Sequence, residues 1–101
     1  GRSYNICEGA LRARLRESLS EPCVITPKVP YLYNIDMWST SIIINKGLRL
    51  RVHITSSSFP AFAVNKNDGS TFGDGINPRK AHIAVFTGGE NASNIVLPVV
   101  K

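Results

Sequence analysis

The 101-residue sequence predicts an all-β fold, and three observations lead to this prediction. Apolar and polar residues alternate with a period of two in several segments, as they do on the two faces of a half-buried strand. Proline- and glycine-containing turns separate these segments. No stretch carries the 3.6-residue apolar repeat of an amphipathic helix. The length fits a single domain over residues 1–101, with room for one core.

Three strands are predicted in the first part of the chain. Segment 11–16 alternates leucine or alanine with arginine, so a strand is favoured over a helix there. Segment 31–38 is rich in strand-forming residues. Segment 48–55 places its leucine, valine and isoleucine side chains on one face and its arginine, histidine and threonine side chains on the other. A short additional strand is expected at 42–44.

Two more strands are predicted near the end, at 81–87 and 95–100. Pro98 lies in the second of these, and because proline donates no ladder hydrogen bond, this strand is expected at a sheet edge. The connections also fit a β protein. Prolines keep residues 21–30 extended, and Asn45-Lys46-Gly47 between two apolar runs predicts a tight turn with glycine at the position tolerant of positive φ.

The segment from Ser56 to Lys80 has no sustained periodicity over about 25 residues, which is long for a loop in a compact domain. Its apolar residues are sufficient to pack the base of the loop, and its asparagines, aspartate and glycines favour turns. The apolar residues are Phe59, Phe62, Val64 and Phe72. An ordered surface loop and a docking loop both fit, and the docking loop is preferred.

The formal net charge is +5 and the pI is about 9.6. A basic chain can bind nucleic acid, but the arginines at 12, 14, 16, 49 and 51 alternate with apolar residues and have no interleaved aromatics for base stacking. They are predicted to form solvated strand faces, and no nucleic-acid partner is expected. No apolar run is long enough for a membrane span, so no membrane partner is expected either. The amino end lacks a signal-peptide pattern, which favours the cytoplasm, and the start on Gly1 suggests a fragment.

No catalytic residue, metal or cofactor is expected. The sequence has no G-x-S-x-G turn to hold a serine nucleophile, and His53 and His82 fit ordinary surface positions. Cys7 and Cys23 are expected to be buried free thiols without the spacing of a zinc site. Residues 65–69 look superficially like a calcium loop, but valine and lysine occupy positions where oxygen ligands are required.

Several segments together resemble a known family. They are 5–14 (NICEGALRAR), 35–41 (IDMWSTS), 46–60 (KGLRLRVHITSSSFP), 95–99 (IVLPV) and Asn65-x-Asn67-x-Gly69. They are similar to the carboxyl-terminal domain of X-Pro dipeptidyl-peptidases, cocaine-esterase-like esterases and glutaryl acylases. The resemblance implies a jelly-roll, galactose-binding-like β-sandwich beside a separate α/β-hydrolase domain that carries the catalytic triad. None of the family's catalytic positions maps onto this chain, which resembles the carboxyl-terminal half of a domain roughly twice as long.

The resemblance leads to one main hypothesis and one alternative. The main hypothesis is a non-catalytic accessory domain of a serine hydrolase that cleaves peptide, ester or amide bonds, with the catalytic α/β-hydrolase domain as its partner. The candidate docking residues are Trp38, Arg49, Arg51, Phe59, Phe62, Asn65 and Asn67. A half-domain would also expose apolar surface and edges, so the chain is expected to self-associate. The alternative is a carbohydrate-binding module that displays Trp38, Tyr31 and Tyr33.

Overall fold

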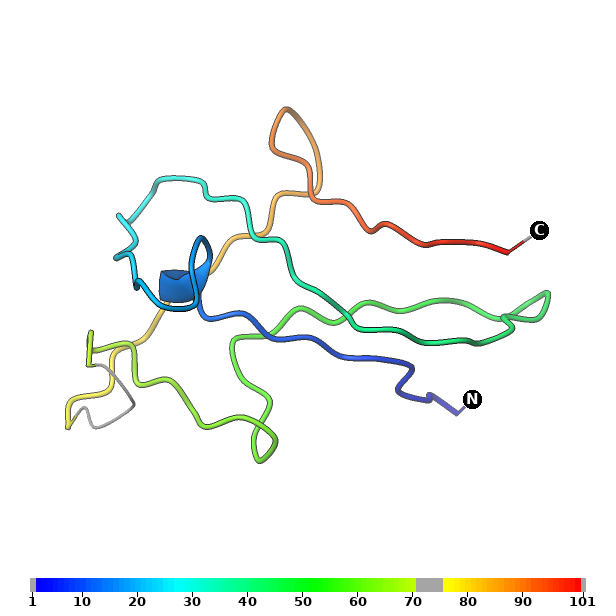
Figure 1. The fold of residues 1–101 in the computed structure, drawn as a ribbon, viewed down its shortest axis with the longest axis horizontal. Helices are drawn as coiled ribbons and strands as arrows, with labels where there is room; N and C mark the ends of the chain where they lie inside the picture. Colours follow the sequence, from blue (N-terminus) through cyan, green and yellow to red (C-terminus); the bar gives the residue numbers. More distant parts are fainter. Residues whose placement is uncertain (1, 71–75, 101) are drawn as a thin grey trace. The chain divides into compact units, whose positions relative to one another are not determined.

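The structure is a computed structural model that describes residues 2–70 and 76–100. Its one regular element in these residues is η1, a 3-10 helix at Ala13–Leu15. The rest of the described chain consists of extended segments and turns (Figure 1). The chain divides into two compact units, Gly1–Leu50 and Arg51–Lys101, and each is described by itself. No helix among the described residues is long and apolar enough to cross a membrane.

The prediction of an all-β jelly-roll sandwich is wrong for this structure, because residues 2–70 and 76–100 contain no strand. Alternation of apolar and polar residues requires only an extended backbone with two faces. A strand also needs a neighbour that pairs with it through a ladder of backbone hydrogen bonds. Most backbone–backbone bonds here close local turns, and the predicted strand segments other than 11–16 are extended but without ladders (Figure 1). The period-two pattern therefore indicates an extended backbone, but it does not indicate whether a neighbouring segment pairs with it.

The first predicted strand, 11–16, differs in its local geometry as well. Its backbone turns at η1, where the Leu15 N–H donates to the Arg12 carbonyl oxygen at 2.8 Å. Such a turn breaks the two-residue alternation of faces, so the arginines of this segment do not share one solvated strand face. The preference for a strand over a helix was wrong at residues 13–15.

In the first unit the amino-terminal segment runs antiparallel to the segment that follows residue 34 (Figure 1). The Thr40 hydroxyl donates to the Ile6 carbonyl oxygen at 3.4 Å, and Gly9 lies directly against the Asp36 backbone. A side chain at position 9 would overlap the Asp36 carbonyl oxygen, so this close approach requires glycine. The predicted turn at Asn45-Lys46-Gly47 is confirmed: the Leu48 N–H bonds the Asn45 carbonyl oxygen at 3.1 Å, and Gly47 has φ of 91°.

In the second unit three extended stretches lie beside one another. Residues 54–56 and 81–85 border one hollow, and residues 93–95 border a second hollow together with 52–54 and 85–87. The Ser93 N–H donates to the Phe86 carbonyl oxygen at 2.8 Å, after a reversal through Gly89 with φ of 75°. Because these stretches border the same hollows, isoleucine and valine side chains from distant parts of the sequence line them together.

Neither unit has a buried core among the described residues. No residue there is buried as a whole, and the half-buried residues gather mostly near η1. The chain exposes 10168 Å². A folded monomer of 11.0 kDa is expected to expose about 5600 Å². The excess is roughly 4600 Å², and many large apolar side chains are among the exposed residues.

Candidate functional site

The best-ordered side-chain cluster is centred on Arg16, in the first unit. The Arg16 side chain is only 7% exposed. Its Nη1 donates to the carbonyl oxygens of Ala13 and Cys23, both at 3.1 Å, and its guanidinium lies 4.3 Å from the centroid of the Tyr31 ring. Its Nε lies 3.3 Å from the Glu17 carboxylate, an ion-pair contact whose geometry does not make a hydrogen bond. One guanidinium thus joins η1 to two later parts of the chain.

Two backbone contacts close the same cluster. The Cys23 N–H donates to the Arg14 carbonyl oxygen at 2.7 Å, and the Thr26 N–H donates to the Tyr31 hydroxyl oxygen at 3.0 Å. Hydrogen bonding from Thr26, through its side chain and its backbone N–H, lowers the pKa of Tyr31 below the ordinary value of 10.0, and the charge of Arg16 acts in the same direction. The sequence analysis assigned Arg16 to a solvated strand face, and this was wrong. The stacking of arginine on a tyrosine 15 residues away has no signature in local periodicity.

Tyr31 is therefore held inside this cluster and is half-buried. The carbohydrate-binding alternative required Tyr31, Tyr33 and Trp38 to be displayed together on one exposed face. Tyr33 is 38% exposed and Trp38 is 82% exposed, but the face of Tyr31 stacks on Arg16. No observation in the structure favours that alternative.

Trp38 is the most prominent of the predicted docking residues. Its indole is 82% exposed, although tryptophan is usually at least partly covered. Its backbone has φ of 63°, which is strained for a bulky residue, and its N–H donates to the Asp36 carboxylate at 2.8 Å. The Gly9 and Thr40 contacts on either side hold this turn in place. Strain of this kind persists only where the surroundings enforce it, and it is frequent at functional positions.

The other predicted docking residues are divided between the two units. Arg49 is exposed in the first unit, and Arg51 is exposed in the second. Phe59 and Phe62 are both exposed, at 75% and 46%, so the long loop buries neither of these two aromatic side chains. Phe72, expected to help pack the loop base, lies outside the described residues. The seven predicted docking residues are therefore split, with Trp38 and Arg49 in the first unit and the other five in the second.

Asn65 and Asn67 shape the neck of the long loop. The Asn65 side-chain oxygen accepts the Asn67 N–H at 3.0 Å, and Asn67 adopts φ of 57°, which asparagine tolerates well. The Asn67 amide donates to the Arg79 carbonyl oxygen at 3.2 Å, and the Arg79 N–H donates to the Lys66 carbonyl oxygen at 2.8 Å. These bonds close the loop at residues 66 and 79. Both asparagines thus have a structural role whether or not they also contact a partner.

Asp68 caps the next turn of this loop. The Ser70 hydroxyl and the Ser70 N–H both donate to one Asp68 carboxylate oxygen, at 2.7 Å and 3.1 Å. These bonds favour the charged form and lower the pKa of Asp68 below its ordinary value, with the hydroxyl as the larger cause. Among the described residues, no group of three histidines, cysteines or acids is placed to hold a metal ion. The carboxylate therefore serves as the acceptor of an Asx-type turn.

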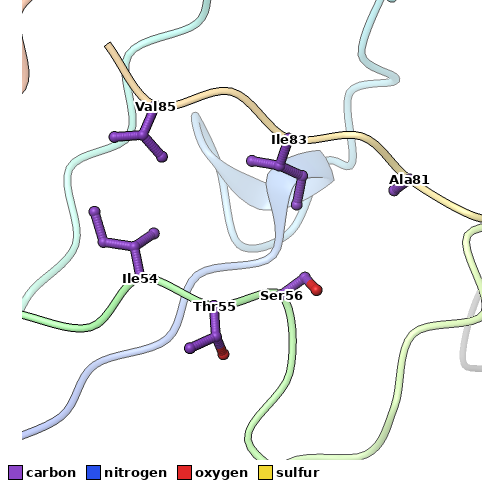
Figure 2. A pocket seen from close by; sticks show the side chains of 6 residues that line it. All are labelled: Ile54, Thr55, Ser56, Ala81, Ile83 and Val85. Atoms are coloured by element: carbon purple, nitrogen blue, oxygen red, sulfur yellow. The ribbon is translucent and has the colours of Figure 1, made fainter. Parts of the chain in front are cut away.

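The second unit contains an open apolar surface that the sequence analysis did not single out. Figure 2 shows Ile54, Ile83 and Val85 directed toward a common hollow of about 350 Å³, with Ser56 and Ala81 at one end. A second hollow of about 330 Å³ shares Ile54 and Val85 with the first. We call the apolar side chains along the two hollows the apolar strip: Val52, Ile54, Ala81, Ile83, Val85 and Ile95. The alternation in 48–55 had already placed Val52 and Ile54 on one face.

The two cysteines belong to the first unit and the two histidines to the second. Cys7 is half-buried and Cys23 is exposed, and both are free, so the expectation of buried thiols is wrong for Cys23. Within the described parts of the chain, neither His53 nor His82 is hydrogen-bonded to a serine hydroxyl or a carboxylate.

Comparison with known proteins identifies the class of this domain. Residues 1–96 match the family of X-Pro dipeptidyl-peptidase C-terminal non-catalytic domains, and the chain belongs to this family. The resemblance found in the sequence and the prediction of a non-catalytic domain from this hydrolase group are thereby confirmed.

A particular relative is the cocaine esterase of Rhodococcus sp. (strain MB1 Bresler). It is 35% identical to this chain over 108 residues, which covers 100% of the chain and 18% of the esterase. The chain thus spans less than a fifth of the length of this relative. No solved structure matched the chain.

Proposed function

We propose that this chain is an accessory domain that packs against the α/β-hydrolase catalytic domain of a serine hydrolase acting on peptide, ester or amide bonds. In this role it stabilises the catalytic domain and helps to form one wall of the substrate cleft. The observation that carries the proposal is the exposed area, 10168 Å², with no residue buried as a whole in the described parts of the chain. A standard interface covers only about 800 Å² on each partner, so the excess surface can supply a large and permanent interface.

Trp38 is the proposed anchor of this interface. Tryptophan is enriched among the few residues that dominate binding energy, because its large ring fills a pocket with little loss of side-chain freedom. The strained and tethered turn holds the indole outward before any partner arrives, which lowers the ordering cost of docking. Phe59 and Phe62 supply further apolar contacts, and Asn65 and Asn67 hold the neck of the loop that carries them. Arg49 and Arg51 are placed at the polar rim.

A chimera of the related esterase tests this proposal. The region of the Rhodococcus esterase that aligns with this chain, 18% of that enzyme, is replaced by the chain, and thermal stability and ester hydrolysis are measured. A Trp38→Ala change is expected to lower the free energy of unfolding of the chimera by about 2 kcal/mol, the scale of an interface anchor. Leu19→Ala is the matched control, since Leu19 is 83% exposed in the same unit.

A further variant separates docking from local folding. Trp38→Gly removes the indole and also relieves the positive φ, so it should leave the first unit intact and still weaken docking. If Trp38→Gly and Trp38→Ala both leave the chimera as stable as the parent, or if Leu19→Ala destabilises it equally, Trp38 is not the anchor.

The same exposed area supports a second element of the proposal, self-association of the isolated chain. Apolar surface that no partner covers is driven from water into contact with another copy. Size-exclusion chromatography with light scattering should therefore give a dimer or larger species at micromolar concentration. A stable 11.0 kDa monomer under those conditions would contradict it.

A further inference from the structure

We infer that the apolar strip of the second unit binds an extended polypeptide segment that has alternating apolar residues and acidic residues at its ends. This goes beyond the proposed docking role, which centres on Trp38 in the first unit. Arg51 is shared between the two proposals, and the experiment below separates them.

The first argument is the state of the backbone along the strip. Residues 52–56 and 81–85 are extended, and within the described chain none of their backbone N–H or C=O groups is bonded to another backbone group. Extended segments with free backbone groups bind a further extended segment by strand addition, in which main-chain hydrogen bonds give affinity and alternate side chains give specificity. The backbone of the strip therefore favours an occupant that is itself extended.

The second argument is the shape and polarity of the strip. Ile54, Ile83 and Val85 face a shared hollow of about 350 Å³ (Figure 2), and each remains between 42% and 66% exposed. The second hollow extends this surface to Ile95. The stretch 52–56 spans about 17 Å at the usual rise of an extended chain, which matches an occupant of five to seven residues. Its alternate side chains must be apolar to fill the two hollows.

The third argument is charge. Arg51 precedes Val52 at one end of the strip, and Arg79 and Lys80 precede Ala81 at the other. Residues 51–56 and 76–87 contain no aspartate or glutamate, and the histidines in them, His53 and His82, add positive charge when protonated. In a second copy the same strip carries the same basic flanks, and this like charge disfavours the strip of a second copy as the occupant. Acidic residues at both ends of the bound segment complement these flanks and fix its register.

Synthetic peptides added to the full 101-residue chain test the inference. The probe is DEVTVTVED, labelled with a fluorophore, and its binding is followed by fluorescence anisotropy at low and high salt. The comparison peptides are KRVTVTVRK, with basic ends, and DEVTPTVED, in which proline disrupts strand pairing. The acidic peptide is expected to bind at least tenfold more tightly than either, and its advantage over the basic peptide should shrink in 0.5 M salt.

Two sets of variants locate the site. The double change Arg51→Glu and Lys80→Glu alters exposed residues without touching the strip, and it should reverse the preference so that KRVTVTVRK binds more tightly. Ile83→Asp should abolish binding of DEVTVTVED, whereas Ile76→Asp, at a residue 90% exposed and outside the strip, should leave it unchanged. Trp38→Ala should also leave peptide binding unchanged, although it weakens docking in the chimera.

Three results would overturn the inference. One is equal binding of the acidic and basic peptides, or a preference that the charge-reversal pair does not change. Another is equal binding of the proline peptide, which would show that no extended pairing occurs. The last is an absence of peptide binding at millimolar concentration. This result would overturn the inference even if the cause were a second copy of the chain covering the strip. A failed Trp38 test with intact peptide binding would refute only the docking role.

Discussion

Replacing Arg16 with alanine should disrupt the local order of residues 12–31. The change removes both hydrogen bonds from Nη1, to Ala13 and Cys23, together with the stacking on Tyr31. These contacts are the side-chain links between η1 and the later part of the segment. Because the side chain is 7% exposed, little water competes for the guanidinium, and the loss is expected to be substantial.

The magnitude follows from the contacts. Two hydrogen bonds contribute about 1 kcal/mol each after exchange with water, and the cation–π contact adds about 1 kcal/mol. The ion pair with Glu17 adds little, because the Glu17 side chain is 68% exposed. The sum is about 3 kcal/mol, which corresponds to a change of roughly 100-fold in the local opening equilibrium.

Amide hydrogen exchange measures this effect at one atom. The Cys23 N–H donates to the Arg14 carbonyl oxygen at 2.7 Å, so its exchange reports the opening of the cluster. The protection factor of this N–H should fall roughly 100-fold in Arg16→Ala. If the protection factor of the unsubstituted chain is below about 100, it should fall to that of an unfolded chain. Arg16→Lys keeps the charge but lacks the planar guanidinium with its several donors, so the protection of the Cys23 N–H should fall about tenfold.

The control for charge is Arg49→Ala, at an exposed arginine in the same unit. It should leave Cys23 protection unchanged. The reasoning is refuted if Arg16→Ala leaves Cys23 protection intact, or if Arg49→Ala lowers it by the same factor. Either result would mean that the cluster is held by something other than the guanidinium.

Two further predictions concern a close contact and a titration. Gly9→Ala should destabilise the first unit by about 1–3 kcal/mol, since the added Cβ overlaps the Asp36 carbonyl, while Gly88→Ala, with open space around it, should be nearly neutral in a thermal melt. Ser70→Ala should raise the pKa of Asp68 toward its ordinary value, measured by NMR titration of the carboxyl carbon. Because the pKa of Asp68 is depressed, the turn is stabilised above the ordinary carboxyl pKa and loses this stabilisation as pH falls through the lowered value. An unchanged Asp68 titration in Ser70→Ala would exclude the hydroxyl as the main cause.

Part of the fold was accessible from local sequence. The turn at Asn45-Lys46-Gly47 was predictable because a glycine at the end of a tight turn tolerates the positive φ that the backbone requires there. The alternation in 48–55 predicted that Val52 and Ile54 share a face, and both line the apolar strip. These features depend on a few neighbouring residues, and so a single sequence carries them.

The candidate site was predictable only in its general character. The exposure of Trp38 agrees with its choice as a docking residue, but its strained backbone depends on the Asp36 carboxylate and on the tether of Gly9 to a segment 27 residues away. The apolar strip combines Ile54 with Ile83 and Val85, both of which lie about 30 residues later in the sequence than Ile54. Which extended segments lie beside one another is a matter of chain topology, and residue periodicity does not encode it.

The sequence by itself determined the family to which the chain belongs, because the matching motifs run almost end to end. Its period of two also indicated an extended backbone in several segments, although 11–16 turns at η1. Only the tertiary structure decided that these segments have no ladders and that Arg16 is covered by Tyr31 instead of facing water. The physical reason is the same for both: backbone pairing and guanidinium stacking each need a partner at a fixed place in space, and alternation along one segment specifies only the direction of its own side chains.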